Sequence, residues 1–69
     1  IIGLAVFDHA TGERLGEITE VMYTGSNDVY VVKTSGGTSK AIPAVADVIK
    51  NVDPANGTMT VNIPEGLWD

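Results

Sequence analysis

Two β-forming segments separated by a short loop occupy residues 15–33, and they constrain the fold more than any other stretch of the chain. The first segment contains one isoleucine, one valine and one tyrosine, and the second contains three valines and one tyrosine. These residue types suit the pleated, half-buried surface of a sheet. The loop at residues 25–28 is built from residues that tolerate positive φ or hydrogen-bond their own backbone. The stretch therefore predicts a central antiparallel hairpin.

The first arm of this hairpin changes the phase of its alternation. Ile18 and Val21 are three residues apart, whereas Val21 and Tyr23 are two apart. A strict period of two would place Ile18 and Val21 on opposite faces of a strand. One extra residue at 19–20 would return them to one face, so we predict a β-bulge there. A helix over residues 15–22 fits the same spacing, but the β-forming arm beyond it favours the hairpin.

Turn-forming residues divide the rest of the chain into short segments. Glycine at position 12, the Gly-Gly pair at 36–37 and the Pro-Ala-Asn-Gly run at 54–57 mark turns. In the last segment Met59, Val61 and Ile63 alternate with polar residues and are expected to face inward. Besides the two hairpin arms, the predicted strands cover residues 1–7, 40–43, 47–53 and 58–63.

Residues 44–46 are predicted to form a single helical turn between two of these strands. A helix over residues 44–51 is the alternative, because of the alanine content of this segment. The nearby Pro54 and the shortness of the segment favour a turn followed by a strand.

A chain of 69 residues without cysteine has few ways to bury an adequate core. A domain of this size buries only roughly 60% of the surface that its unfolded chain exposes, and no disulfide can assist. Six short strands are too few for two packed sheets, whereas curling one sheet into a barrel removes its exposed edges. We therefore predict that residues 1–69 form one domain, a small six-stranded, mostly antiparallel β-barrel with at most one short helical turn.

The net charge of −5 limits the classes of partner. Nucleic acid binding depends on neutralising phosphates, so an acidic chain is expected to make little direct contact with RNA or DNA. An acidic surface favours a basic protein partner, and it also keeps a small domain soluble. There is no apolar run of membrane-spanning length and no signal-peptide pattern. Because the first residue is isoleucine rather than methionine, we expect a piece of a longer protein.

Catalytic, cofactor and metal sites are not expected. His9 is the only histidine, and Asp8 and Glu13 are its carboxylate neighbours. A zinc site needs three or four convergent ligands, and a hydrolytic triad would need this histidine to meet both a serine and an orienting carboxylate. A barrel this small fills its interior with side chains and leaves no pocket for chemistry. We therefore expect a protein that is not an enzyme.

The partner-binding candidates are Tyr23, Tyr30, Leu67 and Trp68. Tyrosine and tryptophan are enriched at binding hot spots because they combine a large apolar area with a polar tip. The two tyrosines alternatively complete the wall of the barrel. Trp68 either folds back on the barrel, packs on a further domain or contacts a partner.

Six short motifs occur in a fixed order along the whole chain. This ordered set resembles the C-terminal PRC-barrel domain of the ribosome maturation factor RimM family. The motifs are Ile-Gly-Leu at 2–4, Leu-Gly at 15–16, Thr-Gly-Ser-Asn-Asp-Val at 24–29, Ile-Pro-Ala at 42–44, Asn-Gly at 56–57 and Pro-Glu-Gly-Leu at 64–67.

The resemblance implies a cytoplasmic, non-enzymatic bacterial assembly factor with two β-barrels. The N-terminal barrel and a linker with paired tyrosines would be missing here. The family assists maturation of the head of the 30S subunit and processing of 16S rRNA, and binds immature subunits. The PRC-barrel is the part that docks the head protein uS19. The alternatives are a PRC-barrel adaptor of another setting, reaction-centre-like or stand-alone, and a barrel that binds rRNA directly through Arg14, Lys33 and Lys40.

Overall fold

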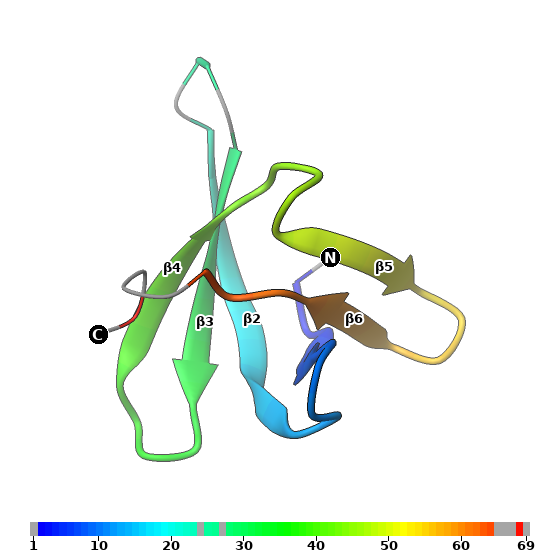
Figure 1. The fold of residues 1–69 in the computed structure, drawn as a ribbon. Coiled ribbons are helices and arrows are strands. Elements are labelled where there is room, and N and C mark those ends of the chain that lie inside the picture. Colours follow the sequence, from blue (N-terminus) through cyan, green and yellow to red (C-terminus); the bar gives the residue numbers. More distant parts are fainter. Residues whose placement is uncertain (1, 24, 27, 65–67, 69) are drawn as a thin grey trace.

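Six short strands pair into one continuous sheet (Figure 1). This computed structural model describes residues 2–23, 25, 26, 28–64 and 68. Those residues contain no helix, and hence none that is long and apolar enough to cross a membrane. In chain order the strands are β1 (Ala5–Asp8), β2 (Arg14–Tyr23), β3 (Asp28–Thr34), β4 (Ser39–Pro43), β5 (Ile49–Asp53) and β6 (Thr58–Val61).

The strands lie in the order β4-β3-β2-β1-β6-β5. The β1–β6 pair is parallel and the other four pairs are antiparallel, which confirms the predicted six-stranded, mostly antiparallel sheet. The sheet curls around its core (Figure 1), but β4 and β5 remain its two edges. The fold is therefore barrel-like, although the expected closure of the hydrogen-bonded ladder is not observed.

A short turn connects the two edge strands. Residues 44–48 pass from β4 to β5, and the Val48 and Ile49 amides donate to the Val45 carbonyl at 3.0 and 2.8 Å. Val48 is buried and Val45 packs against the core, so this connection contributes to the core. The predicted helical turn at 44–46 is thus replaced by a turn centred slightly later, and the alternative helix over 44–51 is wrong.

Three predicted strand boundaries are also corrected. The first strand begins at Ala5 rather than Ile1, because Gly3 has a φ of 95° and its amide donates to the Ile18 carbonyl at 2.8 Å. The fifth begins at Ile49 rather than residue 47, after the turn just described. The sixth ends at Val61 rather than 63, because the Asn62 amide donates to the Val48 carbonyl at 2.7 Å instead of extending a ladder.

The predicted β-bulge in β2 is confirmed. Ile18 pairs with Val32 and Glu20 pairs with Val31, so Thr19 is the extra residue. Val21 then pairs with Tyr30, which places it on the same face as Ile18. This face, which we call the inner face, is the one that carries the buried side chains.

The core consists of aliphatic side chains and one methionine on the inner face. Met59 and Val61 have no exposed surface and Ile63 packs against the core, as their alternation predicted. No buried polar or charged residue occurs among the described residues. The buried hydrophobic residues are Leu4, Val6, Ile18, Val32, Ile42, Val48, Met59 and Val61.

Gly16 allows the sheet to curl where β2 lies between β1 and β3. It pairs with Val6 on one side and with Thr34 on the other. A Cβ atom at this position would overlap the Lys33 carbonyl oxygen and approach Val32 Cγ1 to 2.8 Å. Glycine in a strand interior commonly marks such a close approach of two backbones.

Replacing Gly16 by alanine is therefore expected to destabilise the fold. Because backbone atoms must shift to admit the methyl group, the free energy of unfolding should fall by roughly 1–3 kcal/mol. Urea unfolding followed by circular dichroism measures it. Gly36→Ala is the matched control, since the nearest atom to its Cβ would be Thr34 Oγ1 at 4.0 Å. The control should change stability by less than about 1 kcal/mol, with stabilisation expected. Equal effects of the two substitutions would contradict the proposed steric role.

Candidate functional site

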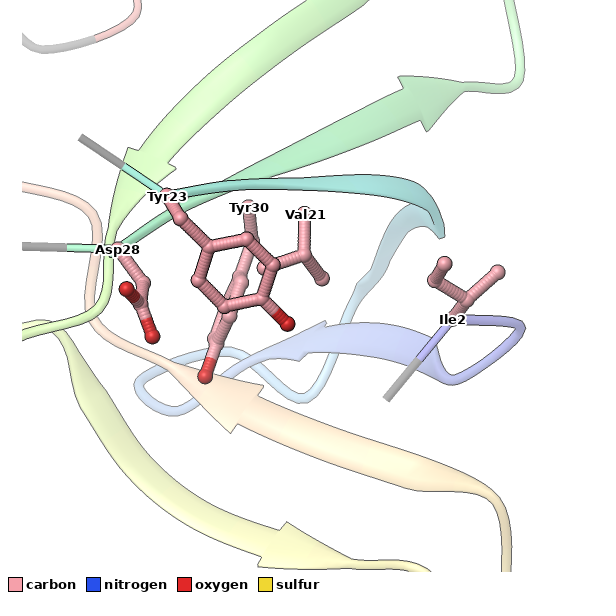
Figure 2. A pocket seen from close by; sticks show the side chains of 5 residues that line it. All are labelled: Ile2, Val21, Tyr23, Asp28 and Tyr30. Atoms are coloured by element: carbon pink, nitrogen blue, oxygen red, sulfur yellow. The ribbon is translucent and has the colours of Figure 1, made fainter.

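The tip of the β2–β3 hairpin extends beyond the rest of the sheet (Figure 1). Beneath it lies an open hollow with a volume of about 440 Å³. Four of its lining residues come from the hairpin and one comes from the segment before β1 (Figure 2). The lining residues, which together define the tyrosine hollow, are Ile2, Val21, Tyr23, Asp28 and Tyr30.

The register of the hairpin brings the four hairpin residues together. Val21 lies opposite Tyr30, and Tyr23 lies opposite Asp28. Directly paired residues share a face of the sheet, and so do residues two apart on one strand. All four side chains therefore lie on the inner face, as Figure 2 shows. Without the extra residue Thr19, Val21 and Tyr23 would face the other side and the hollow would not form.

The tyrosine hollow continues the core face, and the described residues leave it partly exposed. Val21 and Tyr30 are half-buried and pack against the core, whereas Tyr23 is 80% exposed and Ile2 is 67% exposed. Large exposed apolar side chains that adjoin a core are typical of a binding surface. Both tyrosines of the chain lie in this one place.

The side chains of the tyrosine hollow are of types that bind a partner through apolar and polar contacts. It offers two phenol rings, two aliphatic side chains and one carboxylate. Within the described part of the chain, no group of three or more histidine, cysteine, aspartate or glutamate side chains could hold a metal ion. His9 lies in an exposed turn, where its backbone amide donates to the Val61 carbonyl at 2.7 Å.

Trp68 lies elsewhere and folds back on the barrel. Its indole Nε1 donates to the Ala41 carbonyl of edge strand β4 at 3.1 Å. The Lys40 ammonium donates to the Trp68 carbonyl at 3.4 Å. The half-buried indole packs against the core. Of the alternatives left open by the sequence, packing on the barrel is the one observed.

The structure thus brings together two of the four predicted binding residues, Tyr23 and Tyr30. Trp68 does not line the hollow, and Leu67 lies outside the described residues. Sequence reasoning missed Val21, Asp28 and Ile2 as members of the hollow. Pairing across the predicted hairpin, with the predicted bulge included, could have found Val21 and Asp28, whereas no sequence signal pointed to Ile2.

The three cations considered as RNA contacts lie on three different strands. Lys33 lies opposite Glu17 in the β2–β3 ladder, Lys40 is engaged by the Trp68 carbonyl, and Arg14 begins β2 on the far side of the bulge from the hairpin tip. They do not form the continuous basic surface that is typical of an RNA-binding face.

Comparisons with known proteins agree on one family. The sequence profile of the family described as the RimM PRC barrel domain matches residues 1–67. The chain is 54% identical over 66 residues to the ribosome maturation factor RimM of Heliobacterium modesticaldum, which covers 94% of this chain and 38% of that protein. It is 48% identical over 69 residues to the RimM of Geotalea daltonii, which covers 100% of this chain and 39% of that protein.

The fold has a counterpart among solved structures. A crystal structure from Pseudomonas aeruginosa, described as a 16S ribosomal RNA processing protein RimM, superposes with a TM-score of 0.81 at 33% identity. The match covers 91% of this chain and 40% of that one. This chain therefore spans about two fifths of the length of the relatives that it matches.

The anchoring of Trp68 leads to a stability prediction. Trp68→Phe removes the indole donor and leaves the Ala41 carbonyl without it, which should lower the free energy of unfolding by about 0.5–1.5 kcal/mol. Thermal unfolding followed by circular dichroism measures the change. Tyr23→Phe is the control, because Tyr23 is largely exposed and its substitution should stay within about 0.5 kcal/mol. If Trp68→Phe were as stable as the unsubstituted chain, the hydrogen bond would contribute nothing to the fold.

Proposed function

This chain belongs to the RimM PRC barrel domain family, and on that premise we propose that it is the protein-binding module of a ribosome maturation factor. Its proposed partner is uS19, a ribosomal protein of the small-subunit head, within the immature 30S subunit. In this role it would support maturation of the 30S head and processing of 16S rRNA. The family membership supports the role in ribosome maturation, and the surface of the barrel supports binding of a protein partner.

The observation that carries the proposal is the convergence of both tyrosines in one exposed hollow. Tyrosines at the centre of an interface often contribute much of the binding energy, because their rings bury a large area with few rotatable bonds. The hollow includes Asp28, and the chain has a net charge of −5. A basic protein surface complements both features.

Two other functions are less well supported. Direct binding of rRNA would need clustered cations, whereas Arg14, Lys33 and Lys40 lie on three different strands. Lys33 lies opposite Glu17, and the Lys40 ammonium donates to the Trp68 carbonyl. An adaptor role in a reaction-centre-like or stand-alone setting has no support from the family match, which is to the RimM branch of PRC barrels.

The wider setting of the chain follows from the same premise. We propose that residues 1–69 work as one domain beside a second β-barrel of the same protein. The matched relatives are more than twice as long as this chain, which supports that arrangement. We also propose a cytoplasmic, non-enzymatic role, which is supported by the match to ribosome maturation factors.

Titration of the isotope-labelled chain with purified uS19 tests the proposal. Chemical-shift changes are expected at residues 21–23 and 28–30, at the tip of the hairpin. Tyr23→Ala should weaken binding by more than about 1 kcal/mol, or roughly fivefold. Val52→Ala is the control, because Val52 is also partly exposed but lies on edge strand β5, outside the hollow. An unchanged spectrum at a several-fold excess of uS19, or equal losses for both variants, would contradict the proposal.

A further inference from the structure

The tyrosine hollow has a more specific chemistry than a general docking surface. We propose that it binds one arginine side chain of the partner, with the guanidinium group between the rings of Tyr23 and Tyr30 and facing the Asp28 carboxylate. The inference rests on the proposed function, since it names the group that this protein-binding site recognises. It has a test of its own that does not require uS19.

The positions of the two tyrosines on the β2–β3 ladder leave room for a planar group between their side chains. Tyr23 and Tyr30 are diagonal neighbours across the β2–β3 ladder, because Tyr23 pairs with Asp28 and Tyr30 pairs with Val21. Diagonal neighbours on one face of a sheet are separated by about 7–8 Å. This is about twice the 3.5–4.0 Å at which two carbon surfaces touch. The two side chains therefore start far enough apart for one flat group to lie between them, and Figure 2 shows both on the same side of the hairpin as Asp28.

The charge in the hollow selects a cation. Asp28 is the only charged residue among the described lining residues, and the other four are tyrosines or aliphatic residues. A neutral apolar side chain inserted here would remove water from the carboxylate without replacing its hydrogen bonds, which is costly. An anion would meet repulsion from Asp28. A cation is attracted both to the carboxylate and to the faces of the two rings.

Arginine fits the hollow better than lysine. Its planar guanidinium stacks on aromatic rings and can donate two parallel hydrogen bonds to one carboxylate. Lysine presents a compact, strongly hydrated charge that does not stack. The aliphatic part of an arginine side chain would lie against Val21 and Ile2, which complete the hollow. Every lining residue then has a role in the complex.

A small arginine peptide tests the inference directly. The chain contains two tyrosines, and both line the hollow, so the tyrosine ring signals in a proton NMR spectrum report on this site alone. Millimolar tri-arginine should shift the ring signals of Tyr23 and Tyr30 and the amide signal of Asp28. Tri-citrulline, which has the same shape without the charge, should not, and tri-lysine should bind more weakly. Absence of ring shifts with tri-arginine, or equal shifts with tri-citrulline, would overturn the inference.

Substitutions separate this site from general attraction between opposite charges. Asp28→Asn should weaken tri-arginine binding by roughly threefold to thirtyfold, the range that one lost charge-assisted contact represents. Asp47→Asn removes the same charge at an exposed position outside the hollow and should leave binding nearly unchanged. Equal effects of the two substitutions would overturn the inference in favour of non-specific charge attraction.

The same logic applied to uS19 separates the inference from the proposed function. Tyr23→Phe keeps the aromatic face and should bind uS19 several times more tightly than Tyr23→Leu, which keeps only the apolar bulk. If uS19 binds the unsubstituted chain but Phe and Leu are equivalent, the arginine site is wrong and the docking role stands. If uS19 does not bind while tri-arginine still shifts the tyrosine rings, the proposed partner is wrong and the arginine site stands.

Discussion

The whole structure depends on one sheet curling tightly enough to enclose its own core. A single sheet of six strands has no helix or second sheet to cover it among the described residues, so its inner face must pack against itself. Gly16 makes this possible where β2 lies between β1 and β3, because any side chain there would collide with the β3 backbone. The side chains that fill the interior are almost all β-branched or aliphatic, which suits a concave pleated surface.

The β-bulge at Thr19 connects this packing to the binding site. On one side of the bulge, Ile18 faces the core. On the other side, the shifted register keeps Val21 and Tyr23 on the same face, but β2 has by then passed beyond its pairing with β1, while β3 still pairs with β4 (Figure 1). The same apolar face is therefore buried in one half of the hairpin and available to a partner in the other half. Bulges next to functional sites commonly redirect side chains in this way.

Local patterns predicted the parts of the fold that local physics decides. The hairpin, its bulge and the inward alternation of Met59 and Val61 follow from β-propensity and a period of two, and all three are confirmed. The late start of β1 was not predictable, because it depends on a hydrogen bond from Gly3 to the distant Ile18. The lack of hydrogen-bonded pairing between the edge strands β4 and β5 likewise depends on tertiary packing. For the candidate site, residue type pointed to Tyr23 and Tyr30, and hairpin pairing could have added Asp28, whereas Ile2 lies there only through tertiary proximity.

The parallel pairing of β1 with β6 has a consequence for how the chain acquires its shape. Ala5 is matched with Thr58 and Asp8 with Val61, so the strand nearest the start finds its second neighbour near the opposite end. Bringing β1 and β6 together closes a long loop, and its entropic cost arises before the contacts between the two strands stabilise the chain. During synthesis the β1–β2–β3–β4 meander can therefore form early, whereas one edge of β1 stays unpaired until β6 has been translated.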